Sequence, residues 1–322
     1  MSNVILDVDT GEDDALAILL AANTSLNVRL VVSSYGNSTI ENTTRNTRAV
    51  MALAGLTDCP IFRGAAQPAQ QHLHFVDGSA EWESAAEMLG SDGLCGVELS
   101  GCDSVPLITC PEPERVARLA EQVRLYAPVR YIVTGPCTNL AELCQHIGPS
   151  IGEYISSVSI MGGALNVAGN SGPRDSITGE QLAEFNFYCD PYSANVVLRS
   201  GLPIYVVPWD TTYRLTVSAS KMRMLKADNE RSRFITRLMD RYFNLYGHQY
   251  NREFELNDPA AVWLPVFVPE HFGERRLEVV TTTDGFGRLV EHENGSSVLF
   301  HSCESDDIKV LVRELLERLQ LL

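Results

Sequence analysis

DVDTGEDD, which spans Asp7 to Asp14, follows the apolar run at residues 4–6 and precedes another at residues 15–20. Four aspartates and one glutamate therefore fall where a first strand would lead into a first helix. Their mutual repulsion is unfavourable unless a positive charge neutralises it, and a helix amino terminus supplies only part of that charge. Ca²⁺ or Mg²⁺, which prefer oxygen ligands, would complete the balance. The stretch therefore predicts a metal site at the first strand–helix turn.

The acidic stretch also has other interpretations. Helix capping by Thr10 or Asp13 would account for one or two of the acids, not for all of them. An EF-hand loop does not fit, because Gly11 comes one residue too early and the apolar segment follows at once. A phosphatase of the haloacid-dehalogenase type also opens with a strand and D-x-D, although Gly-Thr normally comes next there. A Mg²⁺-dependent phosphatase therefore remains an alternative.

Composition limits the classes of partner. The chain has 322 residues, 45% of them hydrophobic, which is enough to bury a substantial core. Its net charge of −16 argues against binding a nucleic-acid backbone or an anionic membrane. No apolar run approaches membrane-spanning length, and no signal-like segment opens the sequence. The eight cysteines form no C-x-x-C pair, which favours free thiols in a reducing compartment. We therefore expect a cytoplasmic protein.

The first two thirds of the chain alternate between strand-like and helix-like segments. We expect strands at residues 4–8, 28–34, 129–134, 158–161 and 204–207. We expect helices at residues 13–22, 40–54, 112–126, 139–146 and 191–198. Such alternation predicts an α/β fold with a mostly parallel sheet flanked by helices.

The remaining segments are less regular. Residues 64–112 are expected to form a long loop region with short helices, and residues 162–178 a glycine-rich loop. The C-terminal part is expected to be helical at 218–226, 229–250 and from 306, with strands at 277–282, 287–291 and 297–301. Because no repeat or linker interrupts the sequence, we expect a single domain over residues 1–322.

Ligands of parallel α/β sheets bind beyond the carboxyl ends of the strands. Four polar segments of this sequence would lie at that edge: residues 7–14, 33–37, 134–139 and 161–170. Asn139 is expected to cap the helix that follows it. The segments are therefore predicted to converge on one site.

Seven blocks of sequence occur in an order that resembles the nucleoside hydrolase family, the inosine–uridine-preferring type and its relatives. The opening is similar to that family's D-x-D-P-G-x-D-D signature, with Thr10 where proline is common. The other blocks are YGN at 35–37, TGPCTN at 134–139, MGGA at 161–164, GN at 169–170, AEFN at 183–186 and NDP at 257–259. The resemblance covers roughly residues 3–300.

The resemblance implies a Rossmann-like α/β fold and a Ca²⁺-dependent enzyme of nucleoside salvage. Such an enzyme hydrolyses the N-glycosidic bond of a ribonucleoside to a free base and ribose, and is commonly a homodimer or homotetramer. The implied Ca²⁺ ligands are Asp9, Asp14, Asp258 and the main-chain carbonyl of Thr134. Asp9 would also be the general base on the attacking water.

The same resemblance implies the residues that bind the ribose. Asn37 would act near the bond that breaks, and Asp7 would support the acidic loop from behind. The implied substrate-binding residues are Asp13, Asn186 and Asp258 at the 2′- and 3′-hydroxyls, Asn170 and Glu184 at the 5′-hydroxyl, and Met161 of the MGGA block. The chemistry agrees, because cleavage develops oxocarbenium character that nearby carboxylates stabilise.

Two positions depart from the family pattern. Asn257 stands where inosine–uridine members usually have the histidine that protonates the leaving base, and Leu89 stands where a second histidine is expected. Asn257 can hydrogen-bond the base but cannot protonate it. The source of the leaving-group proton is therefore open.

This departure has three possible explanations. His248, or His72 and His74, could supply the proton. Alternatively, Trp82 could stack on a purine, as in the purine-preferring branch, whose second tryptophan would fall at Asn257. Finally, the leaving group could need little help, or the protein could be a catalytically weak riboside-binding protein of the same fold.

Overall fold

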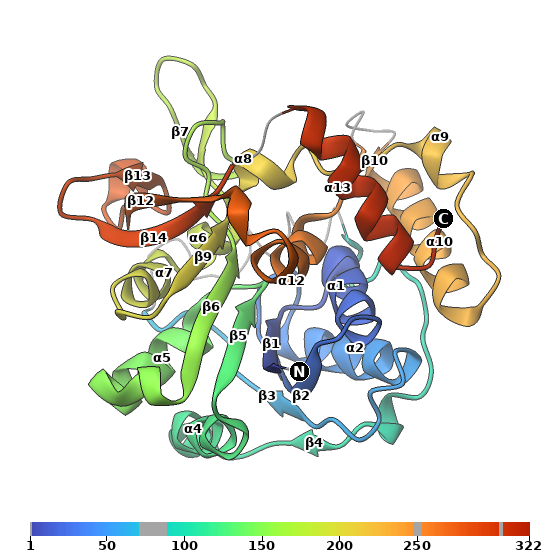
Figure 1. Cartoon of the computed structure of the whole chain (residues 1–322), viewed down its shortest axis with the longest axis horizontal. Coiled ribbons are helices and arrows are strands. Elements are labelled where there is room, and N and C mark those ends of the chain that lie inside the picture. The colour runs from blue at the N-terminus through green and yellow to red at the C-terminus, as the bar shows by residue number, and fades with distance from the viewer. Residues whose placement is uncertain (1, 71–88, 248–252, 303–304) are drawn as a thin grey trace.

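The structure is a computed structural model that describes residues 2–70, 89–247, 253–302 and 305–322. Its centre is a ten-stranded sheet with the order β13-β12-β14-β9-β6-β5-β1-β2-β3-β4 (Figure 1). All neighbours from β14 to β4 are parallel, whereas β12 is antiparallel to both β13 and β14. The strands are β1 (Asn3–Val8), β2 (Asn27–Ser33), β3 (Ile61–Arg63), β4 (Leu107–Ile108), β5 (Val129–Val133), β6 (Ile155–Met161), β9 (Ile204–Val207), β12 (Phe272–Val279), β13 (Leu289–Glu291) and β14 (Ser296–His301). The predicted mostly parallel sheet is confirmed.

Helices flank this sheet, as the alternating sequence pattern predicts (Figure 1). They are α1 (Glu12–Ala22), α2 (Ile40–Leu53), α4 (Arg115–Tyr126), α5 (Thr138–Ile147), α6 (Phe185–Cys189), α7 (Pro191–Leu198), α8 (Trp209–Thr212), α9 (Ala219–Met222), α10 (Glu230–Tyr242), α12 (Asn257–Phe267) and α13 (Ser305–Arg318). A short π-helical turn, Phe243–Gly247, follows α10.

The two faces of the sheet bury separate hydrophobic clusters. On β1, Val4 and Leu6 belong to the cluster that also contains side chains of α1, α12 and α13, whereas Ile5 belongs to the cluster of α4, α5 and α7. This division follows from the strand itself, because successive side chains point to opposite faces. The sheet is thus buried on both sides, as expected for a parallel sheet.

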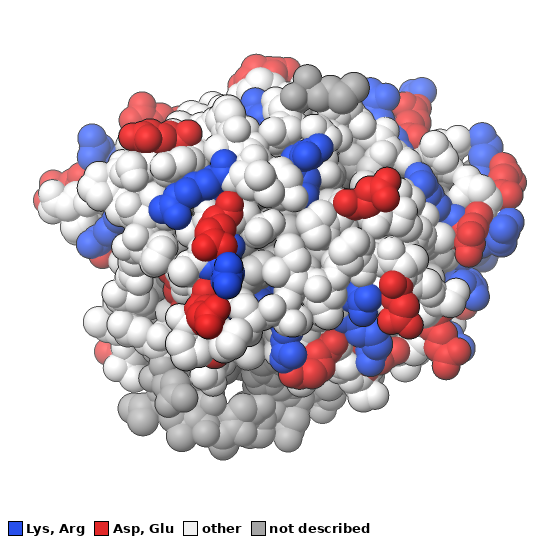
Figure 2. All heavy atoms as spheres, turned by 90° about the horizontal axis from the view of Figure 1, so that it is seen from below, with Lys and Arg blue, Asp and Glu red and all other residues white. Residues whose placement is uncertain are grey.

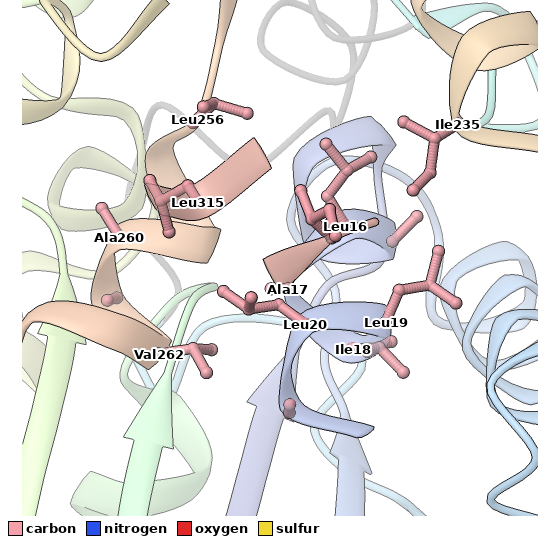
Figure 3. Close-up of a cluster of buried hydrophobic side chains, with 14 of the residues drawn as sticks. Leu16, Ala17, Ile18, Leu19, Leu20, Ile235, Leu256, Ala260, Val262 and Leu315 are labelled. Carbon is pink, nitrogen blue, oxygen red and sulfur yellow. The ribbon is translucent and has the colours of Figure 1, made fainter. Parts of the chain in front are cut away.

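Helix α1 lies inside the first cluster and is apolar around its whole circumference. Residues 15–21 are all at most 1% exposed. Figure 3 shows Leu16 and Leu20 of α1 among Ile235 of α10, Val262 of α12 and Leu315 of α13. A helix that is hydrophobic all round is stable only in such a buried place. The acidic residues at its amino terminus are therefore held on a rigid element.

Several elements differ from the sequence expectations. β3 and β4 were not expected, because strands this short carry too little periodicity to detect. The segment expected as the loop 162–178 contains β7 (Ser171–Arg174), which pairs with β8 (Gln181–Ala183). The helix expected at 218–226 is reduced to α9. β12 begins at Phe272, earlier than the sequence predicted. Its first residues are mostly polar and exposed, so they lack the apolar pattern from which a strand is predicted.

Most of the described cysteines are buried, and charged side chains of both signs lie on the surface (Figure 2). The described cysteines are all free thiols, of which Cys59, Cys95, Cys137, Cys144 and Cys189 are buried. On the face shown in Figure 2, basic and acidic side chains are interspersed. Within the described residues, no helix combines the length and the apolar character needed to cross a membrane.

His301 at the end of β14 is fully buried, and Thr211 lies 2.9 Å from its Nδ1 atom. Burial, and then the charge of His271, lower the His301 pKa from 6.5 to about 3. Below pH 6.5 the His301 side chain is protonated in the unfolded chain but stays neutral in the native protein. The free energy of unfolding therefore falls as the pH decreases from 6.5 towards 3.

We therefore expect the free energy of unfolding to depend less on pH in His301→Gln than in the original protein. The difference should be about 1.4 kcal/mol per pH unit within this window. Urea unfolding of both proteins at several pH values between neutral and mildly acidic measures it. Parallel pH profiles would contradict the prediction.

Candidate active site

Four aspartates from three parts of the chain meet at the carboxyl edge of the sheet. Asp9 follows β1, Asp13 and Asp14 lie in the first turn of α1, and Asp258 lies in the first turn of α12. Carboxylate oxygens of Asp13, Asp14 and Asp258 all lie within 4.8 Å of one another. Asp9 and Asp14 are completely buried, and Asp258 is 3% exposed. The structure therefore brings Asp258 to the acids of residues 9–14, from which most of the chain separates it.

Backbone groups hold Asp9 in place. The Asn37 N–H donates to Asp9 Oδ2 at 2.7 Å. A Cβ atom on Gly36, whose φ is +150°, would lie 2.0 Å from the same oxygen, and one on Gly135 would lie 2.7 Å from Oδ1. Only glycine permits this close approach of the two loops to the carboxylate. The glycines of the YGN and TGPCTN blocks thus serve the position of Asp9.

Asp14 is fixed by polar neighbours on several sides. Its Oδ1 atom accepts a 2.7 Å hydrogen bond from the Thr134 hydroxyl. Its Oδ2 atom accepts from the Gly11 N–H at 3.0 Å and from Asn37 Nδ2 at 3.2 Å. The Thr134 carbonyl accepts from Asn186 Nδ2 at 2.7 Å, which leaves a second lone pair on that oxygen. The Thr134 side chain thus contacts the acids, and its carbonyl can accept a further partner.

The electrostatics of the cluster show an unbalanced negative site. Burial is the main cause that raises the pKa of Asp9, Asp14 and Asp258, and burial raises that of Asp13 to about 6. Asp9 Oδ1 is buried and has no hydrogen-bond partner among the described residues. Oxygen-only donors with surplus negative charge fit a hard divalent cation. These residues could therefore hold a metal ion.

Asp7 lies behind the cluster and does not line the pocket described below. Its two carboxylate oxygens accept 2.9 Å hydrogen bonds from Tyr131 Oη and Asn139 Nδ2. The predicted cap by Asn139 is wrong. Asn139 lies inside α5, and its Oδ1 atom accepts from the Ala65 N–H at 2.8 Å. The Asn139 amide thus links α5 to Asp7 of β1 and to Ala65 in the loop after β3. The position of Asn139 at the start of a helix favoured the capping prediction instead.

A second group of predicted residues lies beside the acids. Glu184 is 2% exposed and accepts hydrogen bonds from the N–H groups of Gly163, Asn186 and Phe187 at 2.8–3.2 Å. Burial raises the Glu184 pKa to about 7. Asn170 Oδ1 is buried without a partner among the described residues. Glu184 therefore both caps α6 and faces the site.

One pocket joins these residues. Its lining includes nine of the predicted site residues: Asp13, Asn37, Thr134, Met161, Asn170, Glu184, Asn186, Asn257 and Asp258. Asn257 donates from Nδ2 to Asp13 Oδ2 at 3.1 Å. Asp9 and Asp14 are not among the lining residues and lie buried beside them. Most of the predicted residues that the structure describes thus line one pocket.

The pocket also contains residues that received no role from the sequence: Glu12, Leu89, Phe185, Trp209, Tyr242 and Glu255. Glu12 belongs to the acidic stretch after β1, and Trp209 follows the carboxyl end of β9. Because ligands of parallel sheets bind beyond the carboxyl ends of the strands, both residues could have been predicted from the sequence. Glu255 lies two residues before Asn257, which is the signal that could have indicated it. Trp82, His248, His72 and His74 lie outside the described residues.

Fold and pocket together define an α/β protein with a buried, acidic centre beside a polar pocket. The sequence profile of the family described as "Inosine-uridine preferring nucleoside hydrolase" matches residues 4–315. The protein named pyrimidine-specific ribonucleoside hydrolase RihA of Photobacterium profundum is 32% identical over 288 residues, covering 88% of this chain and 85% of that protein. RihA of Escherichia coli O1:K1 is 33% identical with the same coverage.

Solved structures share the fold. A purine-preferring ribonucleoside hydrolase from Gardnerella vaginalis gives a TM-score of 0.83 at 23% identity, covering 99% of this chain and 98% of that one. The plant nucleoside hydrolase PpNRh1 gives 0.80 at 22% identity, covering 99% of each chain. The chain belongs to the inosine-uridine preferring nucleoside hydrolase family, and the expected enzyme class is confirmed.

We expect Asn139→Ala to destabilise the protein by about 2 kcal/mol, because it leaves the Asp7 carboxylate and the Ala65 N–H without these buried partners. Asn166→Ala is the control, since its side chain is bonded to Asp210 at an exposed position. Urea unfolding compares the two. An equal effect of both substitutions would contradict the support that we assign to Asn139.

Proposed function

We propose that this protein hydrolyses the N-glycosidic bond of ribonucleosides in a Ca²⁺-dependent reaction and releases a free base and ribose. The observation that carries the proposal is the cluster of carboxylate oxygens from Asp13, Asp14 and Asp258 beside a pocket lined by further polar side chains. Asp9 lies fully buried next to this cluster, close enough for its charge to raise the pKa of Asp258. The named relatives support it as well, since all are described as nucleoside hydrolases.

In this proposal Asp9, Asp14, Asp258 and the Thr134 carbonyl hold the cation. Asp13 contributes to the same cluster of carboxylate oxygens, so it could approach both the cation and a ribose hydroxyl. A bound Ca²⁺ would lower the pKa of the attacking water and orient it. The surrounding acids would ionise more readily beside the positive charge.

Asp9 would act as the general base. Its Oδ2 atom is held by the Asn37 N–H, whereas its buried Oδ1 atom has no partner among the described residues. The free oxygen can therefore take a proton from water while the carboxylate keeps its orientation. Direct attack by water, with no covalent intermediate, would invert the anomeric carbon.

The ribose would be bound by hydroxyl-specific partners. Asp13, Asn186 and Asp258 would bind the 2′- and 3′-hydroxyls. Asn170 and Glu184 would bind the 5′-hydroxyl, which would satisfy the unpartnered Asn170 Oδ1. A deoxyribose would leave buried acceptors without donors, so ribosides should be preferred. The same carboxylates would stabilise positive charge as it develops on the sugar.

The leaving base would meet Leu89 and Asn257 at the positions where the family resemblance leads us to expect histidines. No histidine, lysine or arginine lines the described part of the pocket. Protonation by His248, stacking by Trp82, and a base that needs little activation therefore remain alternative proposals. The relatives with 32–33% identity are named pyrimidine-specific, which favours pyrimidine ribosides as the first substrates to test.

Family membership argues against the phosphatase alternative. So does the pocket, because a phosphate ester would meet carboxylates and no cationic side chain in its described lining. Two further proposals follow from the resemblance: a homodimer or homotetramer, and a role in nucleoside salvage. Two others follow from the sequence pattern and the composition: a single domain and a cytoplasmic location.

The first test is release of free base from pyrimidine and purine ribonucleosides after chelation, with and without added Ca²⁺. We expect release to depend on Ca²⁺, because the buried acids repel one another without it. Ultraviolet absorbance and reducing-sugar assays measure the two products. A cleaved phosphate ester with no cleaved riboside would instead identify a phosphatase.

The second test concerns Asp9. We expect Asp9→Ala to lower kcat by roughly 10³-fold or more, because it removes both a metal ligand and the proposed base. Asp9→Asn should be similarly slow but should retain some riboside binding, measured by calorimetry. Asp58→Asn, at an exposed position, is the control. Near-normal turnover in Asp9→Ala would refute the assigned role.

A further inference from the structure

Three polar pocket-lining residues have no role in binding the cation or the ribose in the hydrolysis just proposed. Glu12 begins α1, Glu255 ends β11 (Phe254–Glu255), and Asn257 begins α12. Glu12 and Glu255 come from distant parts of the sequence, yet both line the same pocket. The pocket thus has a polar edge besides its ribose-binding acids.

This edge presents hydrogen-bond acceptors. Glu12 Oε2 and Asn257 Oδ1 are both buried and have no hydrogen-bond partner among the described residues. The orientation of the Asn257 amide is determined by its 3.1 Å bond, because the Asp13 carboxylate must accept from the NH₂ group. Asn257 therefore offers an oxygen at the position where a family histidine would offer an N–H.

No cationic donor satisfies these acceptors within the described pocket lining, which contains neither lysine, arginine nor histidine. A buried acceptor without a donor is costly, and a ligand that supplies an N–H group recovers that cost. A ligand carbonyl oxygen at the same place would be repelled by the oxygen atoms of Glu12 and Asn257, which also carry negative partial charge. The edge therefore distinguishes bases by the donors that they present.

We propose that Glu12, Glu255 and Asn257 form a specificity edge that selects ribonucleosides whose leaving base carries an exocyclic amino group. The inference rests on the proposed function and specifies its substrate. Cytosine presents an amino group where uracil presents a carbonyl, and guanine carries an amino group that hypoxanthine lacks. Cytidine should therefore be preferred to uridine, and guanosine to inosine, whichever ring size the pocket accepts.

The test measures kcat/KM for the pairs cytidine–uridine and guanosine–inosine with Ca²⁺ present. In the original protein, the amino-bearing member of each cleaved pair should be preferred. Glu12→Gln and Glu255→Gln should each lower that preference about tenfold, because a glutamine amide can also donate to a carbonyl. The control Glu153→Gln, at an exposed position, should leave the preference unchanged.

The ratio separates recognition from damage to the fold, since a structural defect would slow both members of a pair equally. If Glu12→Gln does not fold, Glu255→Gln decides alone. Base release with preference for uridine or inosine, or with ratios that neither variant changes, would overturn the inference and leave the proposed function intact. No base release from any ribonucleoside would overturn the proposed function and this inference together.

Discussion

The structure depends on one electrostatic constraint: several carboxylates are buried together at the carboxyl edge of a parallel sheet. Burial and mutual repulsion both raise their pKa values, so this arrangement is unfavourable unless the rest of the fold enforces it. The enforcement comes from apolar packing. Helix α1 is surrounded by hydrophobic side chains, and α12 packs against it, so Asp14 and Asp258 are brought together by elements that cannot easily separate.

The fold was largely predictable because its central strands are short apolar runs bounded by polar turns. Alternation of apolar runs with helical segments predicted β1, β5, β6 and β9. Because ligands of parallel sheets bind beyond the carboxyl ends of the strands, the place where the polar loops converge could then be predicted too. Strands such as β4, with two residues, hold too little pattern to detect. Their position depends on pairing with a neighbouring strand, which only the folded chain shows.

The site was predictable in part, for a different reason. Asp9, Asp14 and Glu184 were recognised from blocks that resemble a family, and their roles remain predictions. Residues outside those blocks, such as Glu255 and Trp209, line the pocket because of how distant segments dock. For Asn139 the sequence suggested a wrong role. Its position at the start of a helix predicted a cap, whereas its side-chain amide donates a hydrogen bond to Asp7 of β1.

Asp258 is separated from Asp14 by most of the chain, and this separation has a consequence for folding. The oxygen cluster can form only after the segment containing α12 has docked on α1, a contact of long sequence separation that is slow to form. An incompletely synthesised chain would therefore lack the complete cluster. Cation affinity would then increase only late in folding, so that the metal would stabilise the finished protein and not its intermediates.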